Sequence, residues 1–112
     1  MTLLIVRIED TRTHQTEQRI LGDWHKCMKA GVLIGSDAVC HVHLTGSQVA
    51  ERHARYYALS HHRFLDILDD SAVVRFPGSD SAARKGDYLR VDYRPFMIGP
   101  YVLTFGEQRE PG

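Results

Sequence analysis

Short apolar runs separated by polar turn residues recur along the whole chain. Residues 2–8 are rich in β-branched side chains and end in a polar cluster, which predicts a strand that enters a loop. The same pattern predicts further short strands at 17–21, 32–35, 41–44, 54–59, 63–68, 73–76, 88–91, 96–98 and 101–105. Many short strands separated by glycine, aspartate, serine and proline are typical of an all-β sandwich or barrel.

One stretch, residues 47–59, fits two interpretations. Its apolar and aromatic residues fall at helix-like intervals, but Ala54, Tyr56 and Ala58 alternate as they would in a strand. We predict a strand over 54–59 because the flanking segments are β. No long helix is predicted anywhere in the chain.

The length of 112 residues suits one domain with one core. We expect the domain to cover residues 1–106 and to be followed by a polar tail at 107–112. With 43% hydrophobic and 25% charged residues, burial can offset the ordering entropy, so the chain should fold. The apolar start at residues 1–6 lacks the features of a signal peptide, and no run is long enough to span a bilayer. We therefore expect a cytoplasmic protein.

The balance of charges restricts the class of partner that this chain can bind. Lys plus Arg and Asp plus Glu are equal at 14 each, so no global field favours nucleic acid or an acidic membrane, and a local patch must select a partner. We expect a protein or peptide partner, in a phosphorylated or unphosphorylated form, and no nucleic acid and no membrane. Cys27 and Cys40 are predicted to be free buried thiols.

Four motifs together carry a resemblance to a known family. They are the apolar run Gly31–Ser36 that ends in Gly-Ser, the segment Glu51–Ala54, the Gly-Asp turn and strand of Lys85–Val91, and the Gly-containing closing segment Ile98–Phe105. In order and spacing they resemble the forkhead-associated (FHA) domain, from about residue 3 to 106. The resemblance implies a β-sandwich of two mostly antiparallel sheets that binds phosphothreonine peptides in signalling.

The chain departs from the family at the positions that hold phosphate. The family places Arg where this chain has Ser36, Ser where it has Ala50, and Asn where it has Pro77. Arginine suits that role because its planar fork makes two charge-assisted bonds to a dianion. Asp69 and Asp70 would also repel a phosphate unless they turn away. We therefore expect an interaction module that does not depend on phosphothreonine.

The resemblance assigns ligand contacts to loops at one end of the sandwich. The expected ligand-binding residues are Ser36, Ser47, Gln48, Arg52 and Gly78. The expected structural signature consists of Gly35, His53, Gly86 and Asp87. In the family the ring of the histidine that corresponds to His53 braces the binding loops.

Two other interaction modes stay open. One is a phosphopeptide reader in which Arg52, or Lys26 and Lys29, supply displaced charge. The other is an assembly subunit that forms homo-oligomers through a sheet face or an edge strand, using the apolar first or last strand. Six basic residues could gather at one end of the sandwich or lie scattered in solvent: Arg52, Arg55, Arg63, Arg75, Arg84 and Lys85.

The chemistry of an enzyme or metalloprotein is not indicated. His41 and His43 would share one face of a strand beside Cys40, but two ligands do not make a metal site. The remaining candidates, His25, His61, His62 and Cys27, match no finger or ribbon spacing. No nucleophile elbow or phosphate-binding loop is present, so we expect no catalysis, no cofactor and no metal. Among the aromatic residues, Trp24 is the strongest candidate for an exposed contact.

Overall fold

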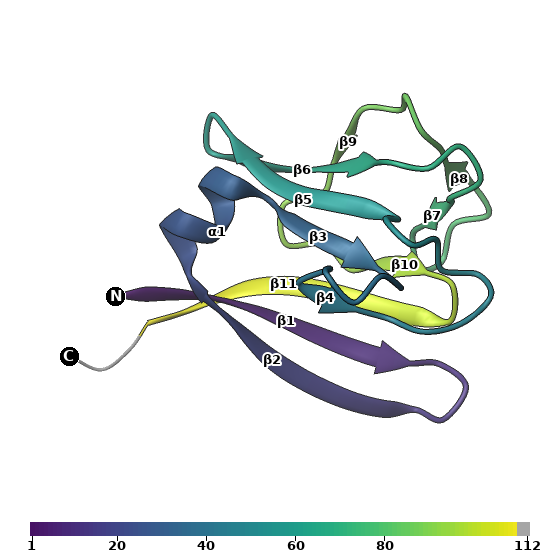
Figure 1. Cartoon of the computed structure of the whole chain (residues 1–112), viewed down its shortest axis with the longest axis horizontal. Helices are drawn as coiled ribbons and strands as arrows, with labels where there is room; N and C mark the ends of the chain where they lie inside the picture. The colour runs from purple at the N-terminus through teal and green to yellow at the C-terminus, as the bar shows by residue number, and fades with distance from the viewer. Residues whose placement is uncertain (110–112) are drawn as a thin grey trace.

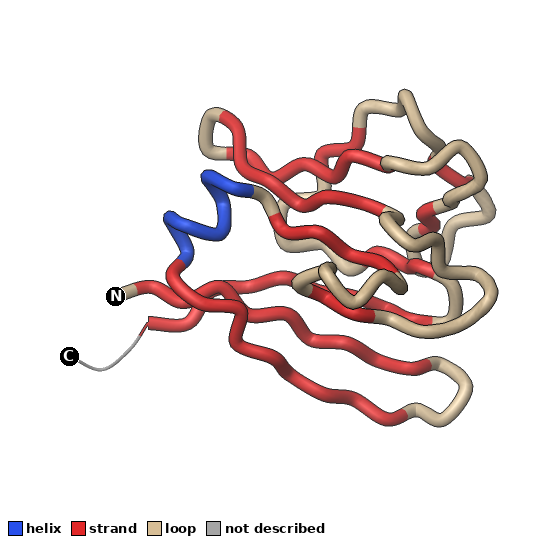
Figure 2. Tube along the Cα trace, in the orientation of Figure 1, coloured by secondary structure: helices blue, strands red, loops and turns tan. Residues whose placement is uncertain are grey.

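Two β-sheets face each other across a shared apolar core (Figure 1). The structure is a computed structural model that describes residues 1–109, and within this range it contains eleven strands and one short helix. The all-β sandwich predicted from the sequence is therefore confirmed. The helix, the N-terminus and the end of the last described strand lie at one end of the sandwich, and most of the long connections lie at the other (Figure 2).

The larger sheet has six strands in the order β2-β1-β11-β10-β7-β8. Their bounds are β1 (Thr2–Asp10), β2 (Gln15–Asp23), β7 (Val74–Arg75), β8 (Ala82–Ala83), β10 (Phe96–Ile98) and β11 (Tyr101–Arg109). The first and last strands pair with each other from Thr2–Arg109 to Asp10–Tyr101, inside the sheet. The expectation that the first or last strand offers a free edge is therefore wrong, because β2 and β8 form the edges.

The smaller sheet has five strands in the order β4-β3-β5-β6-β9. Their bounds are β3 (Val32–Gly35), β4 (Val42–His43), β5 (Ala54–Leu59), β6 (His62–Ile67) and β9 (Leu89–Arg90). The pairing of β3 with β4 is parallel, whereas β3–β5, β5–β6 and β6–β9 are antiparallel. This agrees with the expected mostly antiparallel architecture.

Several boundaries differ from those predicted. β3, β5 and β10 begin and end where the apolar pattern places them, but β11 continues to Arg109 because β1 supplies a hydrogen-bonding partner along its whole length. Residues 107–109 of the expected tail therefore belong to a strand, and 110–112 lie outside the described residues. Strand β8 was not predicted, since a two-residue strand leaves no periodic signal.

The helix α1 (Trp24–Ala30) was not predicted either. The carboxylate of Asp23 accepts a hydrogen bond from the backbone N–H of Lys26 at 3.0 Å, which caps the first turn. Gly31 ends the helix with φ of 82°, a conformation that favours glycine. Only Met28 of the helix is buried, so the sequence shows no amphipathic period. No helix in residues 1–109 has the length and apolar character to cross a bilayer.

Aromatic rings join the two sheets at the core. Tyr56 of β5 stacks on Phe105 of β11 with ring centroids 3.9 Å apart, and Phe96 of β10 lies 6.1 Å from Phe105. All three rings are buried. Cys27 and Cys40 are free thiols, as predicted; Cys40 is buried and Cys27 is half-buried.

Candidate functional site

Loops gather at the end of the sandwich that lies away from the helix (Figure 1). We use the name loop end for the connections 36–41, 44–53 and 68–73 together with the turn at 99–100. The hydroxyl of Tyr101 donates a hydrogen bond to the carbonyl of Thr45 at 2.9 Å, which ties the 44–53 connection to the start of β11. The backbone N–H and the hydroxyl of Thr11 both donate to the carbonyl of Pro100. Residues far apart in the sequence are thus held in one surface.

Gly35 lets the chain before β5 lie directly against the end of β3. A Cβ atom at this position would lie 2.2 Å from the carbonyl oxygen of Glu51, a backbone atom that cannot move aside easily. The backbone N–H of Ser36 donates to the carbonyl of Ala50, and that of Asp37 donates to the carbonyl of Glu51, each at 3.0 Å. Glycine is required here by this close approach of two backbones.

His53 connects two of the loops from inside the molecule. Its side chain is 1% exposed. Nδ1 accepts a hydrogen bond from the backbone N–H of Ala50 at 3.1 Å, and Nε2 lies 2.8 Å from the carbonyl oxygen of Val73, to which it donates. This pair of bonds needs the neutral ring with its proton on Nε2. Burial lowers the pKa of His53 below the ordinary histidine value, which favours that form.

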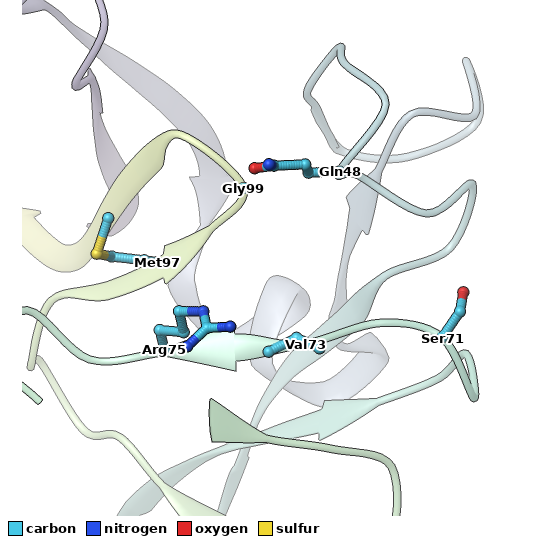
Figure 3. Close-up of a pocket in the computed structure, with 6 residues that line it drawn as sticks. All are labelled: Gln48, Ser71, Val73, Arg75, Met97 and Gly99. Atoms are coloured by element: carbon cyan, nitrogen blue, oxygen red, sulfur yellow. The ribbon is translucent and has the colours of Figure 1, made fainter. Parts of the chain in front are cut away.

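A pocket of about 310 Å³ opens at the loop end (Figure 3). Its lining comes from three segments of the chain: Gln48, Ser71, Val73, Arg75, Met97 and Gly99. The side chain of Gln48 extends toward Gly99, where an added Cβ would lie 3.3 Å from the Cβ of Gln48. The pocket therefore combines one cation, an amide and a hydroxyl with apolar walls.

Arg75 is the cation of this pocket. Its side chain is exposed, and within residues 1–109 no acidic side chain forms an ion pair with it. Asp69, two residues before the pocket residue Ser71, has a local partner: both the backbone N–H and the hydroxyl of Ser71 donate to one of its carboxylate oxygens, at 2.8 and 2.6 Å. These two bonds lower the pKa of Asp69. The guanidinium of Arg75 thus remains available for an anionic group on a ligand.

Of the five residues predicted to bind a ligand, Gln48 lines this pocket. Ser36 lies beside Ala50, and its carbonyl oxygen is 3.0 Å from Nε2 of His43. Ser47 and Arg52 are exposed in the 44–53 connection without lining the pocket. Gly78 has φ of 80° in the connection after β7 and does not line the pocket either.

The Gly86–Asp87 pair forms a tight turn between β8 and β9. Gly86 has φ of 99°, which glycine adopts without strain. The carboxylate of Asp87 accepts from the backbone N–H of Arg84 at 2.8 Å, and its own N–H donates to the carbonyl of Arg84 at 3.0 Å. These contacts are local and structural.

The sequence singled out Arg75 only as one of six basic residues that could gather at one end of the sandwich. The pocket residues Ser71, Val73, Met97 and Gly99 were not predicted to bind a ligand. In this part of the chain the resemblance to the FHA family points to Pro77 and Gly78 instead. Strand alternation offered a signal, because Arg75 follows the buried Val74 and must point to the other face. The approach of Met97 and Gly99 depends on strand pairing and left no local signal.

The basic residues considered at the sequence level do not form one cluster. Arg55 pairs with Asp66 at 3.7 Å, and Lys85 pairs with the exposed Asp70 at 3.7 Å. Arg63 stacks over Trp24 with its guanidinium carbon 4.7 Å from the ring centroid. Trp24 is half-buried by this contact and lies at the helix end of the molecule.

The Cys40–His43 segment has structural contacts of its own. Nδ1 of His41 accepts a hydrogen bond from the backbone N–H of Leu33 at 3.0 Å, and the thiol of Cys40 donates to the carbonyl of Glu51 at 3.3 Å. In the described part of the chain, no group of three or more His, Cys, Asp or Glu side chains is arranged to hold a metal ion.

Comparisons of the chain with family models and with curated proteins found no match.

Proposed function

We propose that this chain is a protein-interaction module of the FHA type that binds a protein or peptide partner at the loop end and does not require phosphothreonine. The sandwich architecture, the four family-like motifs and a pocket at the loop end support this proposal. Loops held by a rigid β scaffold are common sites of recognition, and they can be adapted to different ligands.

The observation that carries the proposal is the pairing of Ser36 with Ala50. The backbones of these residues are joined by a 3.0 Å hydrogen bond, so the two positions at which the family grips phosphate are neighbours. A hydroxymethyl and a methyl group stand there instead of a guanidinium and a hydroxyl. Without the cation, this surface loses the charge-assisted bonds on which tight phosphate binding depends.

The pocket suggests which chemistry the partner presents. Arg75 can make two parallel hydrogen bonds to a carboxylate, and the amide of Gln48 can add a donor or an acceptor. Val73 and Met97 supply apolar contact around these polar groups. An acidic side chain flanked by apolar residues on the partner fits this combination.

A charge reversal tests the proposal. Arg75→Glu should weaken capture of the native partner from an extract of the source organism by at least about tenfold, because it places a negative charge where a carboxylate binds. Lys29→Glu reverses an exposed cation of α1 at the other end of the sandwich and serves as the matched control. Quantitative affinity capture with both variants measures the difference. Equal recovery by the two variants would contradict a site at the loop end.

The unpaired charge of Arg75 also favours a second candidate, a phosphopeptide reader with displaced charge. Fluorescence polarisation with phosphothreonine peptides and their unphosphorylated counterparts separates the two functions. We expect no binding that depends on phosphate. Micromolar, phosphate-dependent binding would overturn the first proposal. In that case, the variants Arg75→Ala and Arg52→Ala would show which arginine binds the phosphate, because substitution of that residue would abolish the phosphate-dependent binding.

A further inference from the structure

Strand β2 leaves a long free edge on the six-stranded sheet. It has nine residues and pairs only with β1, whereas the other edge strands of the described chain, β4, β8 and β9, have two residues each. Figure 1 shows β2 at the margin of the molecule. Residues 15–23 contain no proline, and Ile20 is 59% exposed. An edge of this kind presents unpaired backbone N–H and C=O groups to another strand.

Two opposite charges mark one face of this strand. Glu17 and Arg19 lie opposite Ile8 and Val6 of β1, on the side of the sheet that faces the core. At β2 the second sheet covers that side only in part, so Glu17 and Arg19 stay partly exposed and form an ion pair with each other. Arg19 also donates to the carbonyl of His43 at 3.4 Å.

This charge pattern is self-complementary in a single register. When β2 pairs antiparallel with a second copy of itself about Gln18, Glu17 of each copy lies opposite Arg19 of the other. Centring the pair on Glu17 places two carboxylates opposite each other, and centring it on Arg19 places two guanidinium groups together. Opposite charges across a strand pair are stabilising and like charges are destabilising.

We propose that β2 of this chain pairs with β2 of a second copy, antiparallel and centred on Gln18, so that the two six-stranded sheets become one continuous sheet. Charged side chains usually protect a sheet edge against indiscriminate pairing. Here they disfavour the neighbouring registers and allow one, as a two-fold symmetric interface requires.

The other face of the strand fits the same register. Thr16 of one copy lies opposite Ile20 of the other, so the exposed Ile20 side chain gains a cross-strand neighbour, and the two Gln18 amides face each other across the symmetry axis. Pairing limited to residues 15–21 buries less surface than a permanent dimer needs. We therefore expect a weak dimer whose population rises with protein concentration.

Charge reversal and charge exchange test the register. Glu17→Arg and Arg19→Glu each place like charges opposite one another twice in the dimer, and each should weaken self-association by about tenfold or more. The exchange Glu17→Arg/Arg19→Glu restores opposite charges and should return the dimer to near the wild-type level. Sedimentation velocity over a range of concentrations measures each variant. A wild-type protein that stays monomeric, or an exchange that fails to restore association, would overturn the proposal.

A cysteine scan gives an independent measure of the same register. Gln18 is the residue that faces its own copy, so Gln18→Cys should form a disulfide-linked dimer under mild oxidation. Thr16→Cys is the matched control, because Thr16 faces Ile20 and not itself. The wild-type chain reports any cross-linking through Cys27 or Cys40. Stronger cross-linking of Thr16→Cys than of Gln18→Cys would contradict pairing about Gln18.

Discussion

His53 is buried, and its ring holds two loops together through its two nitrogen atoms. A protonated ring could not accept the N–H of Ala50 and would place a charge in the core. Burial is the main reason that the pKa of His53 is lowered, while the hydrogen bond to Val73 and the charge of Asp69 act in the opposite direction. Loop geometry is thus coupled to the neutral state of one residue.

The protonation of His53 should make stability depend on pH. As the pH falls, His53 takes up a proton in the unfolded chain at about pH 6.5, before it does so in the folded chain. The contribution of the neutral ring to the unfolding free energy should therefore be complete above that pH. It should decrease as the pH drops toward the lower pKa of the folded state. Urea unfolding between pH 7 and 5, with an NMR titration of the ring, measures both quantities. His53→Ala should be less stable at pH 7 and lose less on acidification. A ring that titrates above its ordinary range would contradict this account.

At the scale of elements, β3 and the 44–53 connection depend on the missing side chain of Gly35. The Ser36–Ala50 and Asp37–Glu51 hydrogen bonds bring two backbones into direct contact, and this contact positions the connection that carries Gln48. The sequence marks Gly35 as a signature position, but the reason for it is a long-range contact. Sequence alone therefore predicts the strand and not the loop that packs on it.

Gly35→Ala should reduce the unfolding free energy by about 1–3 kcal/mol or more, because the new methyl group would overlap the Glu51 carbonyl and force the backbones apart. Gly106→Ala in β11 is the control. Its added Cβ would lie 3.6 Å from Cγ1 of Ile5, an ordinary contact, so the change should stay within about 1 kcal/mol. Urea denaturation of both variants gives the comparison. Similar losses of unfolding free energy in the two variants would show that the close contact between Gly35 and the Glu51 backbone does not require glycine.

At the scale of the whole molecule, the Tyr56–Phe105 stack joins the five-stranded sheet to the six-stranded sheet. The hydroxyl of Tyr56 donates to the carbonyl of Asp92 at 2.7 Å, which also ties the chain after β9 to this core. Burial raises the pKa of Tyr56, so the ring stays neutral. The side chain of Tyr56 therefore combines apolar packing between the sheets with a hydrogen bond to the chain that follows β9.

Tyr56→Phe should keep the ring stack on Phe105 and remove the hydrogen bond to Asp92. We expect a loss of about 1–2 kcal/mol in unfolding free energy, because the Asp92 carbonyl loses a buried donor. Tyr57→Phe is the matched control, since Tyr57 lies on the opposite face of β5, partly exposed, and within residues 1–109 its hydroxyl has no hydrogen-bond partner. Thermal unfolding of the two variants measures the difference. An equal loss in the two variants would mean that the hydrogen bond from Tyr56 to Asp92 does not contribute to stability.

The sequence by itself determined most of the strands and the all-β class of this protein, because alternation and turn residues act over only a few neighbours. The order of the strands was decided by tertiary structure: β1 and β11 come from opposite ends of the chain and meet inside a sheet. The pocket has the same origin, since Gln48, Arg75 and Gly99 come together only through pairing between distant segments. Local periodicity carries no information about such long-range contacts, so neither the free edge of β2 nor the pocket around Arg75 could be inferred before the fold was known.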